Sequence, residues 1–417
     1  MNLPASEPYL DFAKRLRGQG LIADAWLDGK PRFATAPVWL PEAELDAINR
    51  AAEGFAAAHD ELVQRVLADD ALLATYFRLG TAGRAMWDCA APYWHGIARA
   101  DVFATEAGPM ICELNADTPS GQAEAITLSQ LFAAAPGRDP NAELEDRFCR
   151  LVAFAGQRLE KPLRDLSVGI LYPTELSEDL CLVALYERWL SVRGARVVLG
   201  SPYNLTPRSD GGAALLGEPC DVFLRHYKTD WWAEREPVWL DEAPFPDAEP
   251  LAGPLGLLLA AEMAGKAAVL NPFGAIVPQN KRSLALLWEE RVRFSDESRD
   301  AIERFLPPTF RLETLAADNL RREREDWVLK SDYGCEGEET IVGQAVSQEI
   351  WEASIEQAVP GRWIAQQRFS PRRDEQGRQC NWGVYLVAGA AAGLYARLSQ
   401  GPTDVTALSA AARIVEA

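Results

Sequence analysis

The chain has 417 residues, more than a single compact core usually contains, and this length predicts two or three domains. Its composition, 48% hydrophobic and 25% charged, is that of an ordinary globular protein. The net charge of −19 argues against binding to nucleic acid or to anionic membranes, because both require clustered Lys and Arg.

Three scarce residue types narrow the possible sites. Only seven of the 42 basic residues are lysine, so a lysine at a particular place indicates a need for a compact point charge. The seven cysteines include no C-x-x-C motif, which predicts reduced thiols, and the three histidines lack the spacing of a metal site. The N-terminus lacks the apolar core of a signal peptide, and the most apolar run, PLGLLLAAEMAGKAAVL, is too short to span a bilayer. We therefore expect a cytoplasmic protein.

The first part of the chain is expected to be mainly helical. Residues 1–95 carry apolar residues at helical spacing, with a long helix that begins at Pro41-Glu42. From Trp94 to Leu114 the apolar period changes to two, which is typical of strands. Residues 122–135 return to a helical pattern, and another helix follows the connection GRDPNAELEDRF.

The middle of the chain predicts an α/β layer. SVGILYP has the pattern of a buried strand, a helix capped by Ser177 ends at Gly194, ARVVLG is the next strand, and CDVFLRHY is another candidate. A Pro- and acid-rich loop at residues 236–255 precedes a helix, a strand at 268–271 and a helix after Pro278. The final third is mostly β, in WVLKSDYGCEGEETIVG, RWIAQQRFS and NWGVYLVAGAAAGLYARL.

The most informative pattern is ARADVFATEAGPMICELN, which predicts two strands joined by a turn. Arg99 and Asp101 share one face of the first strand, and Ile111, Glu113 and Asn115 share one face of the second. Folding at the turn places Asp101 opposite Glu113 and Arg99 opposite Asn115. The other faces are expected to be apolar and comprise Ala100, Val102, Ala104, Met110, Cys112 and Leu114.

Such a polar face fits a hard cation. Two carboxylates and an amide oxygen suit Mg²⁺, which takes few protein ligands and leaves positions for phosphate oxygens. The alternative is a cross-strand salt bridge of Arg99 with Asp101 or Glu113 on a solvated face. Spacing alone leaves both interpretations open.

Three further segments are compatible with phosphate binding. Lys330 ends a strand, and Gly334 and Gly337 in the next loop permit a tight backbone whose N–H groups can lie over phosphates, although an ordinary β-turn fits as well. Lys281 stands at the start of a helix, where an exposed first-turn lysine is the alternative. Arg397, in a strand among apolar residues, is either a structural ion pair or a group that stabilises charge during phosphoryl transfer.

At these residues the sequence resembles the glutathionylspermidine synthase-like branch of the ATP-grasp ligases. In that branch the metal-binding hairpin precedes the lysines that bind ATP, as it does here. The matching segments are Arg99-x-Asp101, ELNADTPS (Glu113–Ser120), Asn280-Lys281, the K-x3-G-x-E-G loop (Lys330–Gly337), Gln366-Gln367 and GAAAGLYAR ending at Arg397.

The resemblance implies a set of metal and nucleotide contacts. The residues implied to bind Mg²⁺ are Asp101, Glu113 and Asn115. Those implied to hold ATP are the lysines Lys281 and Lys330, the loop residues Gly334, Glu336 and Gly337, and Gln366 and Gln367 near the adenine.

The resemblance also implies catalytic and substrate contacts. Arg99 and Arg397 would stabilise the acyl phosphate and its transition state. The residues implied to contact substrates are Thr118 and Ser120 and, for a cationic amine, Glu178 and Asp179. The two acids also fit the first turn of a capped helix, where acids are favoured in any case.

The fold implied by the resemblance is an α/β (α+β) ATP-grasp fold with permuted element order. The expected domains are residues 1–160, a helical region with the metal-binding hairpin; 161–270, a pre-ATP-grasp-like α/β domain; and 271–417, the nucleotide-binding lid and C-terminal hairpin.

The implied activity is an ATP-dependent carboxylate–amine ligase that forms an amide through an acyl phosphate. Its cofactors would be ATP and Mg²⁺. Its partners would be two small-molecule substrates, an amine and a carboxylate for which a peptide-like acid is one candidate, and neither nucleic acid nor a membrane is expected as a partner. The Cys/His amidase unit of the bifunctional synthases is not expected here, so glutathione and spermidine themselves are not implied. The oligomeric state stays open.

Two departures from the family pattern support an alternative. Cys335 stands where the family loop usually carries Arg. The tail TDVTALSAAARIVEA lacks the usual terminal pattern of the family, and Asp404 is a candidate substitute for a ligand that this pattern supplies. A catalytically degenerate nucleotide-binding or scaffold protein of the same fold is therefore the second hypothesis, and an ATP-using kinase is the third.

Overall fold

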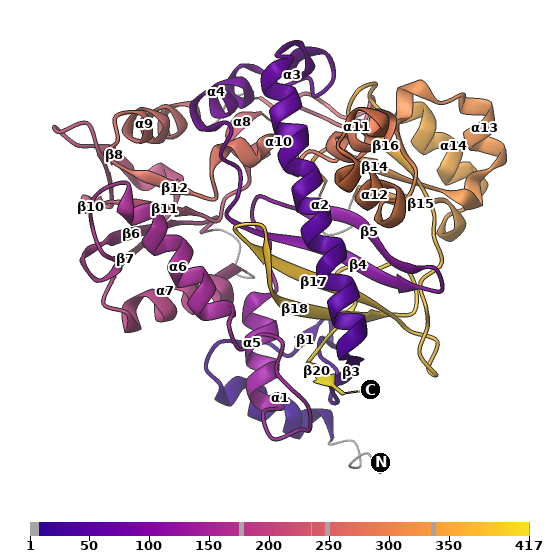
Figure 1. Ribbon diagram of the computed structural model, residues 1–417, viewed down its shortest axis with the longest axis horizontal. Coiled ribbons are helices and arrows are strands. Elements are labelled where there is room, and N and C mark those ends of the chain that lie inside the picture. The colour runs from indigo at the N-terminus through magenta and orange to yellow at the C-terminus, as the bar shows by residue number, and fades with distance from the viewer. Residues whose placement is uncertain (1–7, 175–178, 235, 247–250, 335–338, 417) are drawn as a thin grey trace.

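The computed structural model describes residues 8–174, 179–234, 236–246, 251–334 and 339–416. Three larger sheets organise this part of the chain: a central antiparallel sheet, a parallel sheet on one side of it and a smaller antiparallel sheet on the other (Figure 1). The mixed α/β fold expected from the sequence is confirmed.

The central sheet joins the two ends of the chain. Its strand order is β19-β18-β17-β4-β5, so a hairpin from the first third pairs with strands from the last tenth. Its strands are β4 (Ile97–Thr105), β5 (Gly108–Asn115), β17 (Gln379–Val387), β18 (Ala390–Ser399) and β19 (Leu408–Ala410).

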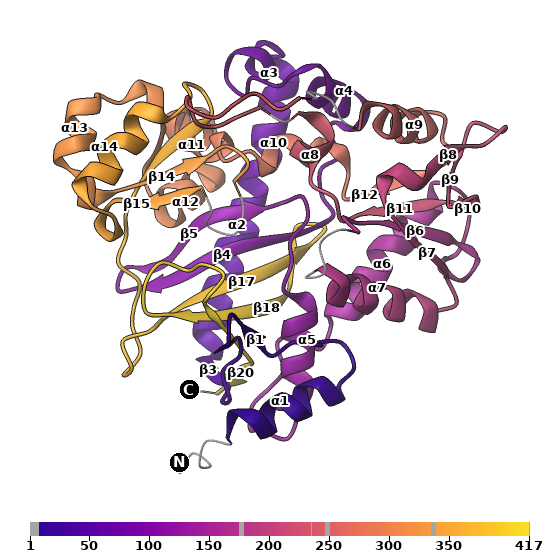
Figure 2. The same cartoon turned by 180° about the vertical axis from the view of Figure 1, so that it is seen from behind.

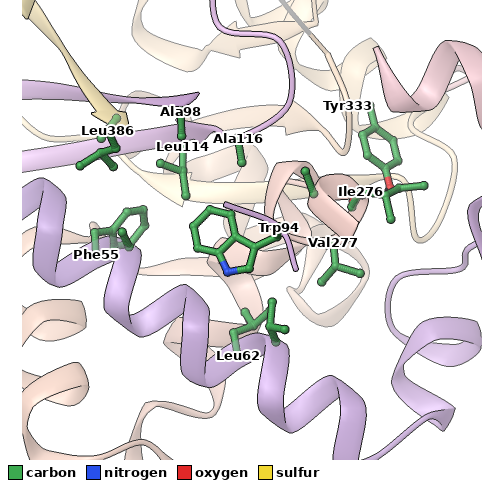
Figure 3. Packing of buried hydrophobic residues seen from close by; sticks show 14 of the residues in the cluster. Phe55, Leu62, Trp94, Ala98, Leu114, Ala116, Ile276, Val277, Tyr333 and Leu386 are labelled. Atoms are coloured by element: carbon green, nitrogen blue, oxygen red, sulfur yellow. Dashed lines mark hydrogen bonds between the residues drawn. The ribbon is translucent and has the colours of Figure 1, made fainter. Parts of the chain in front are cut away.

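One face of the central sheet is covered by the long helix α2 (Glu42–Ala68), which crosses in front of the sheet in Figure 1 and behind it in Figure 2. The helix begins after Pro41, as expected, and its Ala-rich apolar side lies on the sheet. Figure 3 shows this core, in which Phe55 and Leu62 of α2 lie near Trp94, Leu114 and Leu386. Helix α5 (Gln122–Leu131) packs on part of the other face at β18 and β19, where Tyr385 and Tyr395 are buried, and polar side chains of the hairpin share that face.

The parallel sheet forms the α/β layer predicted from the sequence. Its order is β12-β11-β6-β7, and its strands are β6 (Ser167–Leu171), β7 (Arg196–Gly200), β11 (Val222–Arg225) and β12 (Ala268–Leu270). Its neighbouring elements are α5 (Gln122–Leu131), α6 (Leu144–Gln157), α7 (Leu180–Val192), α8 (Thr229–Ala233), α9 (Ala252–Met263) and a meander of β8 (Leu205–Pro207), β9 (Ala213–Leu215) and β10 (Glu218–Cys220).

The smaller sheet, which we call the lid sheet, has the order β13-β16-β14-β15. Its strands are β13 (Thr309–Arg311), β14 (Trp327–Ser331), β15 (Thr340–Val342) and β16 (Trp363–Gln367). The helices nearby in sequence are α10 (Ile276–Gln279), α11 (Arg282–Glu289), α12 (Asp296–Phe305), α13 (Ala317–Arg322) and α14 (Gln348–Gln357).

The remaining elements lie at the two ends of α2. They are α1 (Tyr9–Gly18), β1 (Trp26–Leu27), β2 (Lys30–Pro31), β3 (Val38–Pro41), α3 (Ala71–Thr75), α4 (Thr81–Ala90) and β20 (Ala412–Val415). Strand β20 pairs in parallel with β3, which brings the described C-terminus to the N-terminal region (Figure 1).

Several details differ from the sequence expectations. The helix expected after Pro278 is two helices, with Pro278 inside α10 and Lys281 capping α11. Helix α7 has Asp179 as its N-cap, and Ser177 lies outside the described residues. No helix in the described part of the chain combines the length and the apolar character that crossing a membrane requires.

Candidate active site

The hairpin β4–β5 has the register predicted at its polar end. Arg99 is opposite Asn115 and Asp101 is opposite Glu113. A β-bulge then shifts the pairing, so that Val102 is opposite Ile111 and Cys112 is left without a partner on β4. The four polar residues therefore lie on adjacent strands, at the end of the hairpin away from its turn.

The bulge corrects the predicted side of Ile111. Ile111 was expected on the polar face with Glu113, but it is fully buried in the core beneath α2. One extra residue reverses the alternation of side chains along a strand, and this moves Ile111 to the face that carries Leu114. The bulge also turns the carbonyl of Cys112 toward Lys330, whose Nζ donates a 2.8 Å hydrogen bond to it.

Asp101 is held by two arginines. Arg99 Nε donates to Asp101 Oδ1 at 2.6 Å, and Arg397 Nη2 donates to Asp101 Oδ2 at 2.7 Å. Burial alone would raise the pKa of Asp101, but the two guanidinium groups outweigh it and hold this pKa well below its usual range. Arg99 and Arg397 therefore form ion pairs, as the alternative interpretation of each residue predicted, and both pair with the same carboxylate, that of Asp101.

Strand β17 contributes two residues that the sequence did not single out. Asn381 is buried, its Nδ2 donates to Asp101 Oδ2 at 3.3 Å, and its Oδ1 has no hydrogen-bond partner. Gly383 lies directly opposite Asp101, and the side chain of Arg99 crosses the space where a Cβ would stand. A small residue at 383 thus allows Arg99 to reach Asp101.

Substituting Gly383 with Ala is expected to lower the free energy of unfolding by about 1–3 kcal/mol, because overpacking forces side chains to move. The added Cβ would stand 2.6 Å from Arg99 Cδ, so the Arg99–Asp101 pair must shift. Urea unfolding of the variant measures the loss. Gly253→Ala is the matched control, since a Cβ at Gly253 meets no atom within 4 Å, and equal stability of the two variants would contradict the expectation.

Lys281 lies near Glu113 at the other edge of the polar face, and Lys330 binds the carbonyl of the preceding residue, Cys112. Lys281 Nζ lies 3.9 Å from Glu113 Oε2 and donates to the carbonyl of Gly334 in the lid sheet's loop. Asn115 Nδ2 donates to Glu113 Oε1 at 3.1 Å. Lys281 and Lys330 are 6% and 4% exposed, so Lys281 is not the exposed first-turn lysine that the sequence left as an alternative.

These donors fit a magnesium ion that shares its coordination with a ligand. Glu113, Asn115 and Asp101 supply carboxylate and amide oxygens, and the orphaned Oδ1 of Asn381 lies beside them. Among the described residues, no group of three acidic, His or Cys side chains could hold a metal by itself. Mg²⁺ keeps waters or phosphate oxygens in most of its positions, so a site of this composition would be completed by a nucleotide.

The loop after β5, residues 116–121, is fixed by the parallel sheet. The buried carboxylate of Asp117 pairs with Arg225 and accepts a 2.6 Å hydrogen bond from the backbone N–H of Thr229. Asn271 Nδ2 donates to the carbonyls of Ala116 and Asp117. At the end of the loop, the carbonyl of Ser120 accepts from Arg99 Nη1 at 3.0 Å, so the loop joins the polar face to the α/β layer.

Two of the predicted substrate residues lie toward the carboxyl end of the parallel strands. Thr118 lines a small cavity there with His226, and His226 Nε2 lies 3.0 Å from Asp179 Oδ1. Ligands of open parallel sheets bind at this end of the strands. Ser120 is exposed and meets the site through its carbonyl, and Glu178 lies outside the described residues.

The other predicted nucleotide contacts are less closely joined to the hairpin. Gln366 is buried in the lid sheet, where its Nε2 donates to Thr309 Oγ1 at 3.0 Å, and Gln367 is exposed. Gly334 contacts Lys281 through its carbonyl, while Cys335, Glu336 and Gly337 lie outside the described residues.

Asp404, the candidate substitute in the C-terminal tail, is engaged locally. Its Oδ1 accepts hydrogen bonds from the backbone N–H and from Oγ1 of Thr406, at 2.8 and 2.6 Å. This side chain closes its own turn between β18 and β19. No contact in the described part of the chain joins it to the hairpin, and its role stays a prediction.

Residues 245–411 match the protein family described as glutathionylspermidine synthase preATP-grasp. No curated protein sequence matches the chain. A glutathione synthetase-like effector from Globodera pallida is similar in structure, with a TM-score of 0.58 and 10% identity over 97% of this chain and 96% of that one. A putative gamma-glutamylcysteine synthetase from Methylobacillus flagellatus has a TM-score of 0.47 and 13% identity over 85% of each chain.

The family match confirms the resemblance inferred from the motifs, and it covers Lys281, Lys330 and Arg397. The similarity to the Globodera protein extends over nearly the whole length of both chains, and at 10% identity it shows a shared fold. The chain therefore has a synthetase-like ATP-grasp fold. The roles of individual residues and the domain boundaries stay predictions.

Proposed function

We propose that this chain, whose residues 245–411 match the glutathionylspermidine synthase family, is an ATP-dependent ligase that joins a carboxylate to an amine. One observation carries the proposal: the buried Lys281 lies beside the carboxylate of Glu113, and the buried Lys330 binds the adjacent carbonyl of Cys112, on the hairpin that also holds Asp101 between two arginines. Cations and oxygen ligands converge there from segments far apart in sequence.

The chemistry suits a site without a nucleophilic side chain. A carboxylate oxygen of the acid attacks the γ-phosphorus of ATP, and the bond from this phosphorus to the β–γ bridging oxygen breaks. The products of this step are ADP and an acyl phosphate. The amine nitrogen then attacks the acyl carbon, loses a proton, and expels phosphate as the amide forms. Both steps need positioning and charge neutralisation more than covalent catalysis.

The residues divide this work by position. Lys281 and Lys330 would hold phosphate oxygens at the junction of hairpin and lid sheet, with Gln366 nearer the adenine. Arg99 and Arg397 would neutralise charge on the phosphoryl group in transfer. Mg²⁺, held by Glu113, Asn115 and Asp101, would supply a positive charge that screens the phosphates from one another.

The substrate end of the site would lie at the carboxyl end of the parallel sheet. Thr118 and Ser120 belong to the loop between the two sheets and would contact the acid. Asp179, near His226, would attract a cationic amine, and Glu178 is assigned there from the resemblance alone. Cys89, Cys112, Cys149, Cys220 and Cys380 are free thiols, which suits the reducing cytoplasm that we propose as the location of the protein.

A second candidate, a nucleotide-binding scaffold without turnover, is favoured by one contact. Both oxygens of Asp101 accept hydrogen bonds from arginines, and this is the arrangement of a structural ion pair. A kinase would share the first chemical step and would stop there.

The test begins with Mg·ATP binding by calorimetry and continues with ADP release across panels of acids and amines. We expect micromolar binding, ADP release that requires an acid, and an amide product when an amine is added. Lys330→Ala is expected to lower ADP release by about 100-fold, as for the loss of a charged group that contacts transferring phosphate. Lys266→Ala, at an exposed position, is the control. Binding without ADP release would establish the scaffold, and a phosphorylated product without amide the kinase.

A further inference from the structure

We propose that Lys228 is a third phosphate-binding lysine, which reaches the γ-phosphate of ATP from the α/β layer. The inference rests on the proposed function and adds a residue to its site. Lys228 lies three residues after the end of β11, and it directly follows CDVFLRHY, the segment predicted as a strand candidate. Its side chain is 13% exposed, and its Nζ donates to the carbonyl of Tyr333 at 3.3 Å.

Lys228 lies close to Lys281, because the two lysines bind the carbonyls of neighbouring residues, Tyr333 and Gly334. Lys281 Nζ donates to the carbonyl of Gly334, so two lysines from separate elements bind consecutive carbonyls. Adjacent residues are about 3.8 Å apart, which puts the two ammonium groups within about 10 Å of each other. Three of the seven lysines in the chain therefore lie near Tyr333 and Gly334, since Lys330 is the next-to-last residue of β14.

The neighbours of Lys228 place it toward the transfer end of the nucleotide. Thr229, the next residue, binds the carboxylate of Asp117, and Asp117 belongs to the loop whose Ser120 carbonyl accepts from Arg99. Gln366, the expected adenine contact, belongs to the lid sheet on the other side of Lys330. A cation in this position would lie nearer the γ-phosphate of ATP than the α-phosphate.

Asp230 is one of the groups that lie near Lys228 in this structure, and the ring of Trp231 is another. Asp230 Oδ2 lies 3.4 Å from the Nζ of Lys228, about as far away as the Tyr333 carbonyl at 3.3 Å. Burial raises the pKa of Asp230 even though the neighbouring Lys228 acts to lower it. A phosphate oxygen with full charge would replace the Tyr333 carbonyl as the better acceptor.

A structural role would also explain the contact, because Lys228 joins the segment after β11 to the lid sheet. The two roles differ in what they predict for ATP and ADP. A lysine that contacts the γ-phosphate discriminates between them, whereas a lysine that only fastens the loop affects both nucleotides alike.

The experiment is calorimetric titration of the full chain with Mg·ATP and with Mg·ADP. We expect Lys228→Met to bind Mg·ATP about tenfold more weakly and Mg·ADP within about twofold of wild type, since one charge-assisted hydrogen bond is lost. Lys228→Arg keeps the charge and is expected to lose less than about threefold. Lys266→Met, an exposed lysine of the same layer, is the matched control and should change neither.

Equal weakening of both nucleotides, or unchanged binding of both, would overturn the inference while leaving the proposed function in place. Failure of the wild-type chain to bind either nucleotide would instead remove the proposed function. Thermal unfolding of each variant shows whether it is folded. If Lys228→Met does not fold, Lys228→Gln, which retains a donor for the Tyr333 carbonyl, carries the same expectation.

Discussion

Glu113→Gln is expected to lower ADP release by about 100-fold or more while the protein stays folded. Glu113 is half-buried, lies 3.9 Å from Lys281 Nζ and accepts a hydrogen bond from Asn115. Gln keeps the shape and the acceptor oxygen but removes the negative charge, so the attraction for a divalent ion falls. Turnover with the best acid and amine, together with the urea midpoint, measures the two effects separately.

A matched control for Glu113 is available on helix α2. Glu53 Oε1 accepts a 2.9 Å hydrogen bond from the backbone N–H of Ala391, so Glu53→Gln makes the same chemical change on the helix side of the sheet. This variant should keep wild-type activity. Wild-type turnover in Glu113→Gln would show that the carboxylate has no part in the reaction, and the assignment of the site would fall with it.

Asp117→Ala is expected to lower the free energy of unfolding by about 3–5 kcal/mol, the usual cost of breaking a buried ion pair by removing one partner. Asp117 and Arg225 are both buried, and Asp117 Oδ2 also accepts hydrogen bonds from the N–H and Oγ1 of Thr229. Without Asp117, the guanidinium of Arg225 would keep its burial and lose its counter-charge. Urea unfolding followed by tryptophan fluorescence measures the loss.

The control for Asp117 is an ion pair on the surface. Asp300 and Arg304 pair at 3.1 Å on helix α12 with both side chains exposed. Removing Asp300 should cost less than about 1 kcal/mol, because exposed pairs are screened by solvent. A similarly small cost for Asp117→Ala would mean that the loop after β5 is held mainly by its other contacts, which include those of Asn271 and Gln279 with Ala116 and Asp117.

The hairpin shows how far sequence reasoning reaches. A period of two and a central turn were enough to pair Asp101 with Glu113 and Arg99 with Asn115. The same alternation gave the wrong side for Ile111, because nothing in the local sequence marks the bulge at Cys112. The pattern therefore predicts a register until an extra residue interrupts it.

Residues that arrive from elsewhere in the chain were outside the reach of local patterns. Asn381 contacts Asp101 across 280 positions, and Lys228 meets Tyr333 across 105. The predicted elements around them were correct, but which strands become neighbours depends on the whole fold. The only sequence signal for Lys228 was the small number of lysines in the chain, which made each lysine a candidate for a specific role.

The short strands were missed for a different reason. Strands β8, β9, β10 and β13 have three residues each, which is too few for a period to be recognised. They are stabilised by their sheet partners, and their sequences alone do not specify them.

The order of strands in the central sheet also bears on how the protein is made. Translation delivers β4 long before β17, its neighbour on one side, so the nascent chain carries an unpaired strand edge until nearly all of the sequence has left the ribosome. Such an edge invites pairing with other chains. A polypeptide that ends before residue 379 would lack β17, and this edge of β4 would stay unpaired. Such a fragment would be a substrate for chaperones and proteases.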